Sequence, residues 1–294
     1  MLFRIVDIET VPDPDAWKPS EPVWELRPGF RYDGVVNGEI AARFVGVTGE
    51  GLAEICKLMY VAKEPFPPPQ ANRVVAIAWC DVEMRDTQVV KVGDVSVKSY
   101  EFVGCQSHCH WATPAQERNL IREFGAVMET DPATLVTWNG RGFDLPVLTM
   151  RALKWGVPWG WYYDSEGTRY RYSTSGHLDL MDFLSDYGAS RQMKLDDVSH
   201  LIGLPGKDAG DGFDGSQVAE LVAQGRIEAN RSKVQRYCLQ DVLQTALVFL
   251  RTRYHLGILD EEGYERSLKT FSGSKEVRET INIDWKRVSL GGSK

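Results

Sequence analysis

Apolar residues first follow the pattern of a buried strand over residues 2–8, a run that ends in acidic side chains. Regular alternation of apolar and polar positions resumes at residues 72–81 and continues at 88–92 and 97–103, with short polar links between these segments. Strands joined by such short links predict an antiparallel meander beside the first strand. Residues 11–70 are rich in proline and glycine, so we expect an insert there that leaves the core and holds one helix at about 52–62.

Helical spacing begins at Thr113, which is followed by proline as at many capped helix starts, and it continues to about residue 129. A short apolar strand is predicted at residues 134–138. Further helices are predicted at residues 144–154, 195–202, 216–224 and 232–253. One strand, a meander, a helix, a strand and then helices indicate an α/β fold with a mixed sheet, not the alternating order of a Rossmann fold.

The composition is that of an ordinary globular protein, with 43% hydrophobic and 26% charged residues. No apolar run is long enough to span a membrane, the first residues do not form a signal peptide, and the five cysteines show no disulfide framework. We therefore expect a cytoplasmic protein. The net charge of −7 argues against a sequence-reading DNA-binding module, but not against an enzyme whose bound cations meet the phosphate.

Two carboxylates, Asp7 and Glu9, end the first strand. Because side chains alternate along a strand, both point to one face, with Ile8 buried behind them. Two neighbouring carboxylates repel each other, which favours a cation between them. A solvated strand end explains an isolated pair as well. The pair alone does not identify a metal site.

A second candidate lies where the strand at 134–138 turns into a helix, through Asn139, two glycines, Phe143 and Asp144. Aspartate is a favoured capping residue, and a phenylalanine before the cap is often a core residue. The glycines would also let the backbone approach a ligand closely. A structural role and a role in substrate binding both stay open for this turn.

The third candidate is the pair Tyr237 and Asp241 in the helix at 232–253. A spacing of four residues places both side chains on one face of the helix, one turn apart. An amphipathic helix that carries a tyrosine and an aspartate by chance is the alternative.

Together these elements resemble the three motifs of the DEDD superfamily of exonucleases, in the branch with tyrosine in the third motif. The D-x-E pair, the N-x-x-x-F-D-x-P segment and the Y-x-x-x-D helix occur in that order, each in the expected setting. Over residues 1–253, the sequence resembles predicted bacterial exonucleases related to the proofreading domain of family-B DNA polymerases. Similar stretches lie at residues 73–78, 135–140 and 177–182.

The resemblance implies a ribonuclease H-like α/β fold, in which helices flank a mixed sheet. It implies an exonuclease domain at residues 1–253, with an insert at about 11–70, and a C-terminal extension at 254–294.

An all-carboxylate ligand set suits two Mg²⁺ or Mn²⁺ ions rather than Zn²⁺. By resemblance, Asp7 bridges the two ions, Glu9 and Asp241 complete the first site, and Asp144 serves the second. Tyr237 is expected to orient the attacking water, since phenols, with an ordinary pKa of about 10, are poor general bases near neutral pH.

The expected reaction is 3′→5′ hydrolysis of a single-stranded nucleic acid, DNA in preference to RNA, which releases 5′-mononucleotides. Asn139 and Phe143 are the candidates for gripping the terminal nucleotides. The alternatives are a 3′→5′ exoribonuclease and a non-catalytic nucleic-acid-binding module on the same fold. The sequence predicts no membrane partner and names no protein partner.

Two other segments carry chemistry. The run from Cys105 to His110 contains two cysteines and two histidines, but it lacks a second distant ligand pair, so we expect a surface hairpin or loop rather than a zinc site. Residues 155–172 interleave aromatic side chains with Arg169 and Arg171, which fits either a packed loop or a surface for single-stranded nucleic acid.

Overall fold

The computed structural model describes residues 1–18, 23–26, 60–63, 66–92, 95–206 and 215–290. The chain divides into two compact units, one formed by Met1–Val11 with Asn72–Lys294 and the other by Pro12–Ala71. In the smaller unit, β2 (Val23–Leu26) pairs antiparallel with β3 (Tyr60–Lys63). The helix predicted at 52–62 lies mostly outside the described residues, and it is wrong at residues 60–62, which belong to a strand.

The larger unit is built on a five-stranded sheet with the order β5-β4-β1-β6-β7. Its strands are β1 (Leu2–Pro12), β4 (Asn72–Val92), β5 (Val95–Trp111), β6 (Thr134–Thr137) and β7 (His177–Asp179). β4 and β5 are antiparallel, whereas β6 runs parallel to both β1 and β7. Backbone hydrogen bonds between Met1 and Met84 and a side-chain contact between Thr10 and Asn72 show that β1 runs antiparallel to β4. This mixed sheet confirms the predicted ribonuclease H-like fold.

The antiparallel part of the sheet is a hairpin of two long strands rather than the predicted meander of three. Residues 72–81 and 88–92, predicted as separate strands, both belong to β4. Irregularities between Glu83 and Met84 and between Asp86 and Gln88 shift its register against β5. Such irregularities disturb the sequence alternation without ending the strand, which is why the pattern suggested a break.

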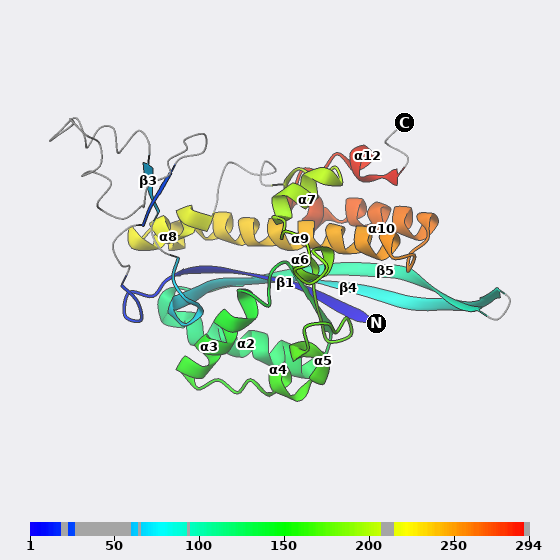
Figure 1. Cartoon of the computed structure of the whole chain (residues 1–294). Coiled ribbons are helices and arrows are strands. Elements are labelled where there is room, and N and C mark those ends of the chain that lie inside the picture. The colour runs from blue at the N-terminus through cyan, green and yellow to red at the C-terminus, as the bar shows by residue number, and fades with distance from the viewer. Residues whose placement is uncertain (19–22, 27–59, 64–65, 93–94, 207–214, 291–294) are drawn as a thin grey trace. The chain divides into compact units, whose positions relative to one another are not determined.

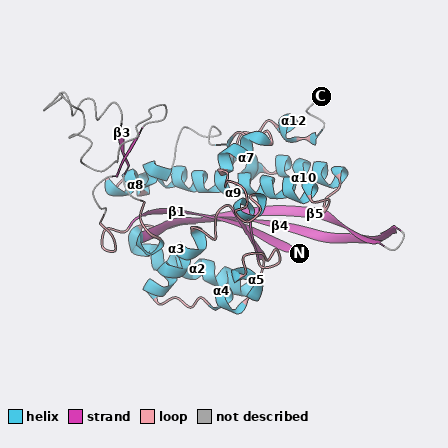
Figure 2. Cartoon of the chain, viewed as in Figure 1, coloured by secondary structure: helices cyan, strands magenta, loops and turns pink. Residues whose placement is uncertain are grey.

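Helices cover both faces of the sheet (Figures 1 and 2). One face packs against α2 (Glu117–Thr130) and α3 (Asp144–Trp155), and Val6 and Ile8 point to that side. The other face packs against α9 (Arg231–His255) and α10 (Glu261–Gly273). Phe3 and Ile5 point to this second side, so the alternation along β1 also carries Asp7 and Glu9 toward α9.

Shorter helices connect and complete these layers. They are α4 (Gly160–Asp164), α5 (Glu166–Arg169), α6 (Leu180–Leu184), α7 (Leu195–Leu201), α8 (Gly215–Ala223), α11 (Lys275–Thr280) and α12 (Trp285–Val288). The residues after 253 bury Phe271, Val277 and Val288 in the same core as Phe3. Among the described helices, none combines the length and apolar character that a membrane span requires.

Two buried arginines, Arg4 and Arg151, form ion pairs on the α2–α3 side of the sheet. Arg4 lies in β1, where it contacts Asp81 at 2.7 Å and Asp131 at 2.9 Å. Glu117 and Arg151 form a second pair with both side chains fully buried. Arg4 thus joins β1 to β4 and to the end of α2, and the second pair joins α2 to α3.

Candidate active site

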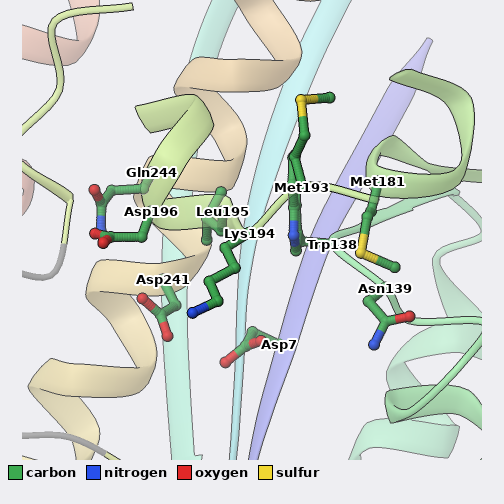
Figure 3. Close-up of a pocket in the computed structure, with 10 residues that line it drawn as sticks. All are labelled: Asp7, Trp138, Asn139, Met181, Met193, Lys194, Leu195, Asp196, Asp241 and Gln244. Atoms are coloured by element: carbon green, nitrogen blue, oxygen red, sulfur yellow. The ribbon is translucent and has the colours of Figure 1, made fainter. Parts of the chain in front are cut away.

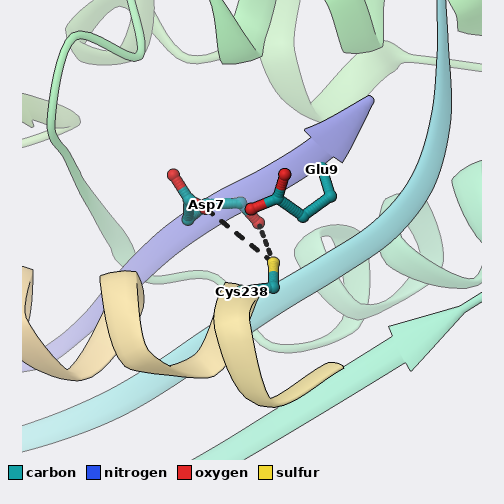
Figure 4. Close-up of side chains that lie close together, drawn as sticks. All are labelled: Asp7, Glu9 and Cys238. Carbon is teal, nitrogen blue, oxygen red and sulfur yellow. Dashed lines mark hydrogen bonds between the residues drawn. The ribbon is translucent and has the colours of Figure 1, made fainter. Parts of the chain in front are cut away.

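The end of β1 presents Asp7 and Glu9 side by side on the face that α9 covers. Asp7 is half-buried and Glu9 is buried. The thiol of Cys238 in α9 lies 3.6 Å from the carbonyl oxygen of Asp7 and 3.8 Å from its Oδ2 (Figure 4). Ligand atoms of these three residues all lie within 4.8 Å of one another. The predicted D-x-E pair is therefore in direct contact with the helix that carries the predicted third motif, through Asp7 and Cys238.

The first residue of α3, Asp144, joins this group from the neighbouring strand–helix turn. Its side chain is buried, and its Oδ1 accepts a hydrogen bond from the backbone N–H of Ile8 at 3.2 Å. The carboxylate thus sits at a helix N-terminus, where the helix dipole favours negative charge, and it is attached to β1 between Asp7 and Glu9.

The turn before Asp144 has a conformation that its glycines make possible. Asn139 adopts a left-handed backbone with φ of 63°, and a Cβ at Gly140 would lie 2.4 Å from Oγ1 of Thr137. A Cβ at Gly142 would lie 2.4 Å from Oδ1 of Asn139. The glycines therefore serve the packing of the turn itself.

Asp179, at the end of β7, holds the same turn in place. Its two carboxylate oxygens accept the backbone N–H groups of Asn139 and Arg141, both at 2.9 Å. The sequence contained a signal for this role, because Asp179 also caps α6 by accepting the N–H of Asp182. In the sequence, Asp179 belongs to the family-like stretch at 177–182.

The 25 residues of α9 contain neither glycine nor proline and carry Tyr237, Cys238 and Asp241. Tyr237 is buried, one helical turn before Asp241, and Asp241 is half-buried. Asp7 and Asp241 line one cavity of about 400 Å³. Glu9, Asp144 and Tyr237 do not line this cavity, and Phe143 packs against the core formed with α2 and α3.

Asn139 lines the same cavity, as predicted for a substrate contact, together with residues that the sequence did not single out. Among these, Lys194 directs its ammonium group toward the space between Asp7 and Asp241 (Figure 3). Lys194 immediately precedes α7, and its sequence pattern is that of any exposed cation before a helix. Only the fold reveals that it faces the carboxylates.

The carboxylates repel one another strongly. Burial raises the pKa of Asp7 well above its usual range, and the charges of Asp144, Asp241 and Glu9 raise it further, against a hydrogen bond from Cys238. Burial also raises the pKa of Asp144 to about 7, with added repulsion from Asp179 and Asp241. A cluster of buried acids is relieved by cations bound among them, and its oxygen donors fit Mg²⁺ or Mn²⁺.

His177, which belongs to the stretch 177–182, stays outside this cluster. It is fully buried, its Nε2 lies 2.8 Å from Oγ1 of Thr137, and burial lowers its pKa to about 3. The side chain is therefore neutral at physiological pH and supports the turn through Thr137.

The candidate zinc run lies in β5 rather than in a loop. His108 and His110 both stack on Trp79, with ring centroids 5.2 and 5.0 Å apart, whereas Cys109 belongs to the opposite face of the strand. His110 lies 3.5 Å from a carboxylate oxygen of Glu123, but in the part of the chain that the structure describes neither histidine belongs to a group of three or more metal-ligating side chains. The run therefore contributes to the hairpin surface.

Comparison with known proteins places this site in a family. A sequence model of predicted 3′–5′ exonucleases related to the exonuclease domain of PolB matches residues 64–283, which include Asp144, Tyr237 and Asp241 but begin after Asp7 and Glu9. A search of curated proteins returned no match.

Among solved structures, the family B DNA polymerase from the hyperthermophilic archaeon Pyrobaculum calidifontis is similar, with a TM-score of 0.48 and 19% identity. The similarity covers 86% of this chain and 24% of the polymerase, so the chain spans about a quarter of that protein. Because the family match covers most of the sequence, the chain belongs to the predicted 3′–5′ exonucleases related to the exonuclease domain of PolB.

Proposed function

We propose that the protein is a divalent-metal-dependent exonuclease that hydrolyses the terminal phosphodiester at the 3′ end of a single-stranded nucleic acid and releases 5′-mononucleotides. We further propose that it prefers DNA to RNA. The observation that carries the proposal is the convergence of Asp7, Glu9, Asp144 and Asp241 from β1, α3 and α9, where burial raises the pKa of Asp7 and repulsion among the carboxylates raises it further. Such repulsion is costly in a folded protein unless cations occupy the cluster.

These four carboxylates would hold two Mg²⁺ or Mn²⁺ ions, with Asp7 between the two positions. When bound, such a pair of ions supplies an activated water and stabilises the leaving oxygen of an in-line displacement. Glu9 and Asp241 would help Asp7 to hold one ion, and Asp144 would help to hold the other.

The remaining residues orient the substrate and the water. Tyr237 lies one turn from Asp241 and is proposed to orient the attacking water by a hydrogen bond. Asn139 lines the cavity and contacts the terminal nucleotide, while Phe143 supports that contact from its half-buried position. Lys194 supplies a positive charge for the phosphate that enters between the carboxylates.

The test is incubation of the purified protein with 5′-labelled single-stranded DNA and RNA of the same sequence, with Mn²⁺ or with EDTA. We expect a ladder that shortens from the 3′ end only with Mn²⁺, faster for DNA, and 5′-mononucleotides as products. Asp241→Asn should abolish this shortening. Equal rates of metal-dependent degradation of the DNA and the RNA oligonucleotide would overturn the preference for DNA. Absence of shortening for both nucleic acids would overturn the proposed activity.

A further inference from the structure

A second cavity of about 390 Å³ lies beside the first and shares two wall residues with it, Asn139 and Met181. Arg169 and Tyr162 line the second cavity, while the first contains Asp7 and Asp241. The two hollows are therefore neighbours on the same unit. A polymer whose end lies in the first cavity can therefore continue into the adjacent second cavity.

The arginines of the second cavity differ in their freedom to bind a ligand. Arg141 donates to the carbonyl oxygens of Thr168, Tyr170 and His177, at 3.0 to 3.1 Å. Arg171 is paired with Asp182 through two hydrogen bonds of 2.7 and 2.6 Å. Both guanidinium groups are thus engaged in holding the cavity wall.

Arg169 is arranged differently. Its guanidinium lies 5.0 Å from the centre of the Tyr163 ring, and within the described residues no carboxylate forms an ion pair with it. Stacking on a ring orients the planar group and leaves its N–H donors available. An oriented, unneutralised guanidinium at a polar cavity is suited to a phosphate.

Exposed tyrosines continue from this arginine. Tyr163, Tyr170 and Tyr172 are 51%, 62% and 55% exposed. The rings of Tyr170 and Tyr172 meet edge to face at 5.7 Å, and Tyr172 meets Tyr187 at 4.8 Å. Single exposed aromatic residues are common, but the contacting rings of Tyr170, Tyr172 and Tyr187 form a platform on which bases can stack, and Tyr163 adds an exposed ring beside Arg169.

The structure also separates the two roles that the aromatic segment 155–172 allows. Its earlier members pack against the core with α2 and α3, namely Trp155, Trp159, Trp161 and Tyr162. The later tyrosines lie outside that core. Packing therefore explains the first half of the segment and leaves the second half without a structural reason.

A short stretch before α7 adds positive charge next to the cavities. Arg191, Gln192 and Lys194 are exposed, and no ion pair engages Arg191 or Lys194 among the residues that the structure describes. Gln192 lines the second cavity and Lys194 the first. Although the chain carries a net charge of −7, Arg191 and Lys194 place positive charge next to the two cavities.

We propose that Arg169, Tyr163, Tyr170 and Tyr172, which we name the tyrosine–arginine track, bind the single strand upstream of its 3′ end. This inference rests on the proposed function of the neighbouring site. Bases stack on the exposed tyrosines, and Arg169 contacts a phosphate where the strand passes Asn139 and Met181. A duplex does not bind in this way, because paired bases hide their faces within the stack.

The test measures binding apart from hydrolysis, by fluorescence anisotropy in EDTA with 5′-labelled oligothymidylates of two and eight nucleotides. We expect Arg169→Ala combined with Tyr172→Ala to weaken binding of the octanucleotide by about tenfold, and that of the dinucleotide by much less. Tyr172→Phe keeps the ring and should keep the affinity. Arg278→Ala, which removes an exposed arginine of α11, is the matched control.

Equal affinity of the wild type and the double variant for the octanucleotide would overturn the track, as would an equal loss for both lengths. Effective competition by a blunt duplex would also overturn it. Failure of the proposed function is distinguishable, because it would show as absent Mn²⁺-dependent shortening while the length-dependent loss of binding persists.

Discussion

Two regions of the same unit bury carboxylates in opposite ways. On the α2–α3 side, Glu117 is fully buried and accepts hydrogen bonds from three residues. It pairs with Arg151 and accepts the backbone N–H of Val74 and the indole N–H of Trp155, both at 2.8 Å. Its charge is neutralised, and its lone pairs are used.

On the α9 side, Asp7 faces three other carboxylates, and the thiol of Cys238 donates to it. Lys194 directs a cation toward this cluster from an exposed position. Burial raises the pKa of Asp7, and repulsion from the three neighbouring carboxylates raises it further.

The comparison teaches that burial of an acid does not by itself mark a functional site. A neutralised pair such as Glu117 and Arg151 connects elements of the fold, whereas a cluster of neighbouring buried acids is maintained against its electrostatic cost. Strongly perturbed acids that line a cavity are typical of catalytic centres. Three changes test whether the two regions differ in this way.

The largest expected effect is on catalysis. Asp7→Asn keeps the shape of the side chain but removes the charge on which both metal positions depend, so we expect the rate of Mn²⁺-dependent shortening to fall by about 10³-fold or more. The measurement is single-turnover hydrolysis of a 5′-labelled oligonucleotide, with circular dichroism to show that the fold is kept.

Asp197→Asn is the matched control, since Asp197 is an exposed aspartate of α7 that does not line the cavity. It should retain the wild-type rate. If Asp7→Asn remains as active as this control, the carboxylate cluster is not the catalytic centre.

The site was largely predictable because its spacing follows from local geometry. Alternation along β1 places Asp7 and Glu9 on one face, and a separation of four places Tyr237 and Asp241 on one helical face. Lys194 and Cys238 could not be found in this manner. Their approach to Asp7 depends on how α7 and α9 lie against the sheet, which no local periodicity encodes.

The fold was predictable to the level of its element order and less so in its details. The helix at 231–255 agrees with its predicted ends to within two residues. The agreement is close because a long run of apolar positions at helical spacing defines a helix well. β7 was missed, since three residues are too few to show alternation, and its pairing with β6 supplies the stability that the sequence does not show.

The next largest effect concerns the neutralised pair. Arg151→Met leaves Glu117 buried without its counter-charge, so we expect the free energy of unfolding to fall by about 3–5 kcal/mol. Urea denaturation in EDTA measures this loss. The catalytic rate below the unfolding transition should stay near that of the wild type, because Arg151 does not line the active-site cavity. A loss below about 1 kcal/mol would mean that the pair contributes little to the fold.

The smallest effect is a pH dependence of stability that comes from the carboxylate cluster. Because the pKa of Asp144 is raised to about 7, the folded metal-free protein binds this proton more tightly than the unfolded chain. Its contribution to stability is complete below a pH of about 4 and is lost as the pH rises toward 7, at up to about 1.4 kcal/mol per unit. Asp144→Asn keeps an oxygen acceptor for the N–H of Ile8 and removes this slope.

The difference between wild type and Asp144→Asn isolates the slope. His177, whose pKa burial lowers to about 3, produces the opposite trend, in which stability falls with decreasing pH below about 6.5. Both proteins contain His177, so its effect cancels. Urea denaturation in EDTA between pH 5 and 8 should show that the free energy of unfolding of the variant rises relative to that of the wild type as pH rises. Saturating Mn²⁺ should shrink that gain, because the ions compensate the ionised cluster. Parallel curves in EDTA would mean that the carboxylates of this region are as well compensated as Glu117.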